Sequence, residues 1–331
     1  MLDLKEVPKI LVIRFSSLGD ILLTTPFLRS LQKKYPNSKI DFFVKTNFID
    51  AITLNPNVDS VFSWQTEEEF INVRKKLEVN NYDLVIDLQN NFRSKKTVKL
   101  LGKKSYSFQK PNVKKFLLVN TKLNLLKEKK TIPQRYIDVF PELKLDGEGL
   151  ELFLPEKVEG KLDNKENIIG MAPGAFHFTK RWPIEYYAEL GNKFVNDGYS
   201  IAIFGGKSDR EICSDLHNRI KESLDLSNDN NLFETASYMK KCKFVVCNDS
   251  GLMHTATSVG VPVVSIFGST VQEFGFAPFG VKNLIIEKND LSCRPCSHIG
   301  KAKCKKKHFK CMKDLTPNLV YNETKKFAEE L

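Results

Sequence analysis

The sequence lacks any run of about 18 uncharged apolar residues, the length that a membrane-spanning helix needs. It also lacks the basic start, apolar middle and small-residue cleavage site of a secretory signal peptide. Instead, residues 1–5 lead directly into a strand-like segment. We therefore expect no membrane-spanning helix and a cytoplasmic location.

Two further absences limit the fold and function classes that the sequence allows. No internal repeat of 20–50 residues is present, which argues against a repeat architecture. The complete Gly-x-Gly-x-x-Gly fingerprint is also missing, so a dinucleotide-dependent dehydrogenase is disfavoured. The chain does have 331 residues, of which 41% are hydrophobic. That length suits two α/β domains with real cores better than one.

Short apolar runs rich in β-branched residues alternate with amphipathic stretches along the chain. This alternation predicts parallel, doubly wound sheets. It is interrupted at 143–166, a region rich in Lys, Glu, Asp and Gly that is typical of a linker. We predict domains at 1–155 and 156–315 and a C-terminal helix at 316–331. In such an arrangement the cleft between the domains is the natural ligand site.

The formal net charge of +11 is concentrated in one stretch. Residues 91–130 contain thirteen Lys or Arg residues and a single acid, Glu128. Such a stretch attracts phosphate or carboxylate groups, although a solvated lysine-rich surface has the same composition. Nucleic-acid binding is a competing hypothesis, but the stretch lacks the regular aromatic residues of a stacking platform.

Residues 113–126 within this stretch are both basic and apolar. They are compatible with an amphipathic helix on a membrane surface. They are equally compatible with a helix packed on the sheet through Val113, Phe116, Leu117, Leu123 and Leu126. We favour packing.

The loop after the first predicted strand, Ser16-Ser17-Leu18-Gly19-Asp20, lies where ligands bind a doubly wound sheet. A carboxylate at this place can accept the proton of an incoming hydroxyl. Asp20 can also be only a helix cap, a role that Asp favours.

Three loops in the C-terminal half follow strands in the same way: 173–183, 248–254 and 267–270. Asp249, Ser250 and Gly251 open a helix whose free N–H groups suit a diphosphate, and His254 lies one turn on. Gly174 permits close approach to a ligand, and Lys180 with Arg181 supplies cations. Helix caps, a core histidine and exposed cations would explain each loop separately. Their convergence at one sheet edge favours a nucleotide diphosphate site.

With these motifs in place, the sequence resembles glycosyltransferase family 9, the lipopolysaccharide heptosyltransferases. The matching segments are Ile10–Thr25, Asp87–Ser94, Arg135–Tyr136, Lys180–Pro183 and Asn248–Thr270. The resemblance implies a GT-B fold, with two Rossmann-like domains facing across a cleft. It also implies inverting transfer of heptose from ADP-heptose to a lipid A–Kdo or heptosyl inner-core acceptor, with no metal or cofactor required. The enzyme would contact the inner membrane peripherally, and we expect a monomer that binds no nucleic acid.

The resemblance also assigns roles to residues. Asp20 matches the catalytic base, Lys180 matches the lysine that steadies the donor diphosphate, and Asp209 matches a position near the donor ribose. The other donor-side residues are Gly174, Asp249, Ser250, Gly251, Leu252 and His254. The expected acceptor-side residues are Ser17, Arg93, Lys95, Lys96 and Arg135. Relatives that use another nucleotide sugar, a nucleotide-sugar epimerase or an inactive scaffold are the alternatives.

Four of the seven cysteines lie close together in the sequence: Cys293, Cys296, Cys304 and Cys311. The Cys-x-x-Cys pair and two further thiols are compatible with a structural zinc ion. Free thiols in an irregular loop, a disulfide and an iron–sulfur cluster are the other interpretations. Cys213, Cys242 and Cys247 have apolar neighbours and are predicted to be core residues.

Overall fold

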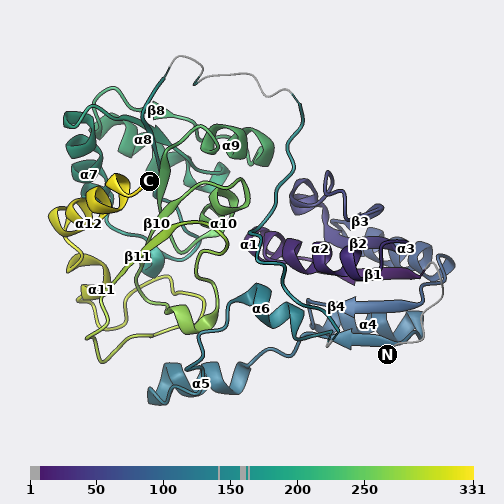
Figure 1. The fold of residues 1–331 in the computed structure, drawn as a ribbon. Helices are drawn as coiled ribbons and strands as arrows, with labels where there is room; N and C mark the ends of the chain where they lie inside the picture. Colours follow the sequence, from purple (N-terminus) through teal and green to yellow (C-terminus); the bar gives the residue numbers. More distant parts are fainter. Residues whose placement is uncertain (1–7, 141, 157–161, 163–164) are drawn as a thin grey trace. The chain divides into compact units, whose positions relative to one another are not determined.

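The computed structural model describes residues 8–140, 142–156, 162 and 165–331, which form two compact units (Figure 1). Unit 1 comprises the described residues of 1–111 and 132–153. Unit 2 comprises those of 112–131 and 154–331. The chain therefore passes between the two units three times.

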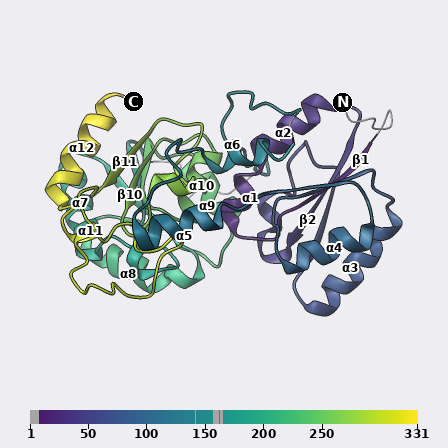
Figure 2. The same cartoon turned by 90° about the horizontal axis from the view of Figure 1, so that it is seen from below.

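Unit 1 contains a parallel sheet with the strand order β3-β2-β1-β4-β5. Its strands are β1 (Lys9–Ile13), β2 (Lys39–Lys45), β3 (Ser60–Trp64), β4 (Leu84–Asp87) and β5 (Ser105–Ser107). Its helices are α1 (Leu18–Leu22), α2 (Thr25–Lys34), α3 (Glu67–Val79), α4 (Phe92–Leu101) and α6 (Ile132–Ile137), with a 3-10 turn at Thr46–Ala51. Helices α3 and α4 lie on one side of this sheet and α2 on the other (Figure 2).

The core of unit 1 follows from the two-residue period of its strands. Leu11 and Ile13 of β1 share one face, and they pack with Phe70 and Leu77 of α3. Helix α3 begins at a capping box, in which the Thr66 side chain accepts a bond from the Glu69 amide. The sequence thus specifies both the start of α3 and the face that it buries.

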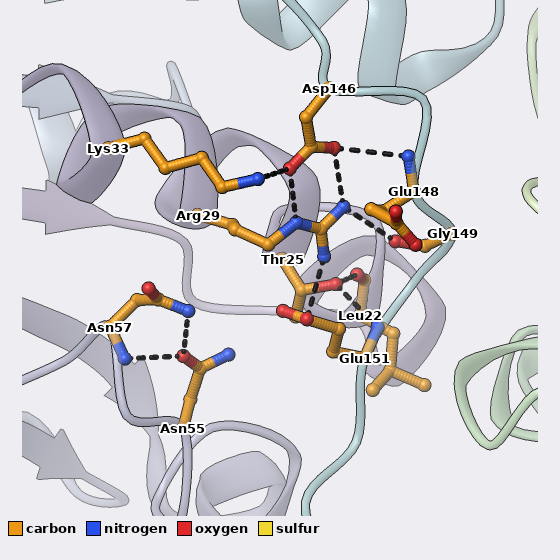
Figure 3. A network of polar contacts seen from close by, with 10 residues as sticks. All are labelled: Leu22, Thr25, Arg29, Lys33, Asn55, Asn57, Asp146, Glu148, Gly149 and Glu151. Atoms are coloured by element: carbon orange, nitrogen blue, oxygen red, sulfur yellow. Dashed lines mark hydrogen bonds and ion pairs between the residues drawn. The ribbon is translucent and has the colours of Figure 1, made fainter.

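A guanidinium clamp fastens the end of unit 1 to helix α2 (Figure 3). The buried Arg29 makes two bonds to the carboxylate of Asp146, of 2.6 and 2.8 Å, and pairs with Glu151 at 2.9 Å. Lys33 also reaches Asp146 at 2.6 Å. The Asp146 carboxyl accepts these charge-assisted bonds, so its pKa lies well below the usual range.

Unit 2 contains a second parallel sheet with the order β11-β10-β9-β6-β7-β8. Its strands are β6 (Ile168–Ala172), β7 (Ser200–Ile203), β8 (Leu224–Asp225), β9 (Phe244–Asn248), β10 (Val263–Phe267) and β11 (Asn283–Glu287). Its helices are α5 (Asn112–Thr121), α7 (Ile184–Asn196), α8 (Arg210–Arg219), α9 (Leu232–Met239), α10 (Gly251–Ser258), α11 (Lys310–Lys313) and α12 (Pro317–Glu329). Short 3-10 turns occur at Phe178–Lys180, Lys207–Asp209 and Gln272–Phe274.

Helices cover both faces of this sheet, as a doubly wound fold requires. Ile169 and Met171 of β6 pack in a core that also takes residues of α7, α8 and α12. Ile168 and Ala172, which point the other way, pack with residues of α9 and α10. The predicted doubly wound architecture is therefore confirmed for each unit.

Several local predictions need correction. The sequence did not indicate strands β3, β5 and β8 or helices α4, α6, α9 and α11. The packing predicted for residues 113–126 is wrong for Val113, Phe116 and Leu123, which are exposed, whereas Leu118 is the buried residue of α5. The part of the predicted linker at 143–166 that the structure describes contains neither helix nor strand; residues 157–161, 163 and 164 lie outside the described residues.

Candidate functional site

In unit 1 the first candidate site surrounds Asp20, in the helix that follows β1. One carboxylate oxygen of Asp20 lies 2.7 Å from the guanidinium of Arg14. The other oxygen accepts bonds from the backbone N–H and the hydroxyl of Ser17, at 3.0 and 2.8 Å. Ser17 is the N-cap residue of α1, and Asp20 is the third helical residue of its capping box. Asp20 therefore takes part in capping, and 18% of its side chain is exposed.

Arg14 is the residue that orients Asp20, and sequence reasoning missed it. Its buried guanidinium also donates to the carbonyls of Ser16 and Leu88, at 2.9 and 2.7 Å, and lies over the ring of Tyr136. Burial disfavours a charged guanidinium, but Tyr136 and Asp20 outweigh that effect and raise the pKa of Arg14. Asp20 thus has a permanent cation beside it.

The loop after β4 supplies the next groups. Asp87 is fully buried and accepts bonds from the Gln89 and Asn90 amides and the Ser94 hydroxyl. Burial raises the pKa of its carboxyl. Lys110, also missed, donates to the carbonyl of Asn90 at 3.3 Å. Burial, and then the nearby Arg14, lower the pKa of Lys110, while Asp20 and Asp87 oppose this shift.

The predicted acceptor residues have different surroundings. Ser17 contacts Asp20, as described, and Lys95 is close enough to Lys110 to affect its pKa. Arg93 instead pairs with Glu67 at 3.1 Å, and the ammonium of Lys96 lies over the ring of Phe92. Arg135 precedes Tyr136 in α6 and is half-buried; burial lowers its pKa. The structure thus places Ser17 beside Asp20, whereas Arg93 forms an ion pair with a residue of α3.

In unit 2 the loops after β6, β9 and β10 meet, because these three strands are neighbours in the sheet. The Asn248 side chain links two of them: it donates to the carbonyl of Pro173 at 2.8 Å and accepts from the Trp182 amide at 3.0 Å. The loop after β10 is linked to the loop after β6 by the hydroxyls of Ser269 and Thr179, which are 3.0 Å apart. The predicted convergence at one sheet edge is therefore present.

Lys180 and Asp249 form the central ion pair of this edge, with 2.7 Å between Nζ and Oδ2. The same oxygen of Asp249 accepts a bond of 2.7 Å from the hydroxyl of Thr270. Both side chains are largely buried, so neither is a free surface charge. Asp249 fixes the ammonium of Lys180 at the edge of the site.

Helix α10 begins directly after Ser250, its N-cap residue. The hydroxyl of Ser250 is buried and has no hydrogen-bond partner among the described residues. Gly251 and Leu252 are half-buried in the first turn, and His254 is buried one turn on. The helix start therefore offers unpaired amides and a hydroxyl, the groups that bind phosphate.

Gly174 and Asp209, predicted on the donor side, are in contact. A Cβ atom at Gly174 would lie 2.4 Å from Cγ of Asp209, so the glycine is required for this approach. Asp209 also accepts a bond of 3.3 Å from the amide of Gly206. These residues come from the loops after β6 and β7, which are adjacent strands.

Arg294, inside the Cys-x-x-Cys segment, is a further residue that the sequence did not indicate. Its guanidinium donates to the carbonyls of Gly268 and Thr270, at 2.7 and 2.8 Å, and pairs with Glu287. It therefore braces the loop that carries Thr270, which in turn bonds to Asp249.

The four clustered cysteines are free thiols; Cys293, Cys296 and Cys304 are half-buried and Cys311 is buried. Sγ of Cys293 lies 3.8 Å from Nε2 of His308. Within the described part of the chain, no three His, Cys, Asp or Glu side chains are grouped as metal ligands. The core positions predicted for Cys213, Cys242 and Cys247 are confirmed.

No helix among the described residues is long and apolar enough to cross a bilayer.

Several known proteins are similar to this chain over almost its whole length. The chain is 28% identical over 324 residues to lipooligosaccharide heptosyltransferase 2 of Campylobacter jejuni subsp. jejuni serotype O:6, covering 94% of this chain and 96% of that protein. A glycosyl transferase family 9 structure from Veillonella parvula superposes with a TM-score of 0.80 at 22% identity, covering 100% and 99% of the two chains. Escherichia coli ADP-heptose lps heptosyltransferase II gives 0.72 at 24% identity, covering 97% and 99%. The fold is thus GT-B. Residues 70–307 match the family described as Glycosyltransferase family 9 (heptosyltransferase), and the chain therefore belongs to that family.

Proposed function

We propose that this protein transfers heptose from ADP-heptose to a lipopolysaccharide or lipooligosaccharide core acceptor. Family membership supports sugar transfer, and the names of the relatives supply the donor and the acceptor. The observation that carries the mechanism is the position of Asp20. It is a partly exposed carboxylate after the first strand of a doubly wound sheet, held by Arg14 and Ser17.

In this mechanism Asp20 takes the proton of the acceptor hydroxyl while the hydroxyl oxygen attacks the anomeric carbon of heptose. The bond from that carbon to the diphosphate oxygen breaks, and ADP leaves with the electron pair. A single displacement of this kind inverts the configuration at the anomeric carbon.

The leaving ADP develops negative charge, which needs compensation by groups already in place. Lys180 supplies an ammonium, and the start of α10 supplies backbone amides and the Ser250 hydroxyl. No metal ion is needed in this scheme. Asp209 and Gly174 are proposed to contact the rest of the donor, and Arg93, Lys95, Lys96 and Arg135 the phosphorylated acceptor.

The test is a donor panel of ADP-heptose, UDP-sugars and GDP-sugars with lipid A core acceptors, read by mass spectrometry. Among these donors, only ADP-heptose is expected to increase the mass of the acceptor, by one heptose. Transfer from a UDP- or GDP-sugar instead would overturn the donor assignment. Conversion of ADP-heptose to an isomer without acceptor would indicate an epimerase.

Substitution of the proposed base gives the second test. Asp20→Asn keeps the size of the side chain but cannot accept the proton, so kcat is expected to fall by about 10²–10⁴-fold. Glu68→Gln, an exposed carboxylate change in α3, is the control and should leave kcat unchanged. A folded Asp20→Asn protein with normal turnover would remove Asp20 as the base.

The structural zinc ion stays a prediction from the sequence. Metal analysis of the purified protein, with Cys296→Ser as the variant and Cys213→Ser as the control, decides it.

A further inference from the structure

Helix α5 and the residue that follows it contact unit 2 through side chains that include two lysines. Leu118 is its buried residue, and the ammonium of Lys115 lies 5.7 Å from the centre of the Phe276 ring. Just after the helix, Lys122 donates to the carbonyls of Pro295 and Cys293, at 2.7 and 3.3 Å. Lys115 and Leu118 are three positions apart and share one face of α5, and Lys122 adds its bonds to unit 2 directly after the helix ends.

Apolar side chains occupy positions that this attachment leaves exposed. Val113 is 73% exposed and Phe116 is 64% exposed, and they share a helix face three residues apart. Leu123 and Leu125 continue the exposed series at 53% and 46%. We call these four residues the apolar edge. An ordinary surface helix buries its large apolar residues, whereas α5 buries Leu118 and leaves Val113 and Phe116 exposed.

The charge around the apolar edge has one sign. Residues 112–131 contain six lysines and one acid, Glu128. Lys114, Lys127, Lys129 and Lys130 are all exposed. Exposed apolar residues among lysines are the composition of segments that bind at the surface of anionic bilayers.

We propose that residues 112–131 dock this protein on an anionic lipid bilayer. The apolar edge enters the boundary between headgroups and acyl chains, and the exposed lysines contact the lipid phosphates. This inference rests on the proposed function, because the proposed acceptor is a glycolipid that lies in a membrane.

A second copy of the chain is a less favourable occupant. A two-fold contact places the same patch of each copy against the other. It would bring two lysine-rich segments together with a single acid in each, and like charges repel. An anionic bilayer complements the charge instead.

The experiment measures cosedimentation of the full chain with vesicles. One set contains equal parts of phosphatidylglycerol and phosphatidylcholine, and the other contains phosphatidylcholine alone. We expect wild-type protein to bind the anionic vesicles and to bind much less to the neutral ones, with binding lost at high salt. Phe116→Glu and Val113→Glu should each weaken binding by about tenfold or more.

Val79→Glu is the matched control, since Val79 is an apolar residue of α3 that is 87% exposed. It should bind like wild type, and all three variants should melt at the wild-type temperature. Equal binding of Phe116→Glu and wild type would overturn the proposal. So would a wild-type dimer in sedimentation velocity that Phe116→Glu dissociates.

Activity separates this inference from the proposed function. With a deacylated, water-soluble acceptor, Phe116→Glu should transfer heptose at the wild-type rate, whereas its rate on acceptor in anionic vesicles should fall. Absence of transfer by wild type on either acceptor would contradict the proposed function and leave the vesicle measurement as the independent test of docking.

Discussion

At the scale of single residues, the reactivity proposed for Asp20 depends on Arg14. Arg14 is buried and makes two backbone bonds as well as the ion pair, so its guanidinium has one available position. A lysine would keep the charge but would lose at least one of the bonds to Ser16 and Leu88. The planar fork of arginine is what makes this arrangement specific.

We therefore expect Arg14→Lys to lower kcat by about 10²-fold, since small displacements of a reacting group cost rate of this order. The KM for ADP-heptose should change little, because Arg14 orients the proposed base through its contacts with Asp20, Ser16 and Leu88. Steady-state kinetics with both substrates checks this. A variant with reduced donor affinity and normal kcat would contradict the role given to Arg14.

The site residues differ in whether they can be recognised from the sequence alone. Asp20, Lys180 and Asp249 stand in loops directly after predicted strands, so their places in the chain indicated them. Arg14 directly follows β1, Lys110 lies in a segment without a motif, and Arg294 lies in the Cys-x-x-Cys segment, where only the cysteines were considered as ligands. Their importance comes from burial and from partners distant in sequence, such as Leu88 for Arg14 and Gly268 for Arg294. One sequence does not reveal such contacts. The functional roles of all these residues stay predictions.

At the scale of elements, the loop after β10 depends on an arginine from the cysteine-rich segment. Arg294 holds the carbonyls of Gly268 and Thr270, Thr270 bonds to Asp249, and Asp249 pairs with Lys180. Arg294 touches neither Lys180 nor Asp249 in this chain of contacts. It is a positioning residue for the proposed donor site.

Arg294→Met should raise the KM for ADP-heptose by about tenfold, because a loosened Thr270 no longer fixes the Asp249–Lys180 pair. The KM for the acceptor should stay the same, and Arg294→Lys should recover part of the loss. Lys288→Met is the control, since the Lys288 side chain makes a partly exposed pair with Asp290, and the substitution keeps the backbone carbonyl that accepts a bond from Arg294. Equal increases in both KM values would indicate general destabilisation instead.

Element prediction succeeded where the pattern was long. Helix α3 (Glu67–Val79) has thirteen residues and begins at a capping box, so its sequence carries enough of a pattern to indicate a helix. Strands β5 and β8 have three and two residues, too few for a period to be recognised. Helix α5 was misread because an apolar residue in an amphipathic pattern is normally assumed to be buried.

At the scale of the whole molecule, one carboxylate makes the stability of unit 1 depend on pH. Unit 1 is fastened by the Asp146 carboxylate, whose pKa lies below its ordinary value of about 3.9. A lowered pKa means that the charged form stabilises the fold at any pH above the ordinary value. That contribution is lost as pH falls through the lowered pKa.

We expect Asp146→Asn to reduce the stability of unit 1 by about 2 kcal/mol near neutral pH, the scale of charge-assisted hydrogen bonds. The difference from wild type should hold down to about pH 4 and shrink below it. Trp64, the buried tryptophan of unit 1, reports the transition by fluorescence in urea. Asp229→Asn, in an exposed pair with Arg210 of unit 2, should have little effect. A pH-independent difference for Asp146→Asn would refute the carboxylate explanation.

Because the chain passes between its units three times, cutting it into two fragments does not separate the units cleanly. A cut near the middle of the sequence would separate Lys122 and Leu118 from the surface they cover, since that surface belongs to the later half. The N-terminal fragment would then carry α5 without the surface that it packs on, and the C-terminal fragment would expose that surface to solvent. Excised pieces are thus expected to aggregate more readily than the intact chain, and a single proteolytic nick should not release either unit.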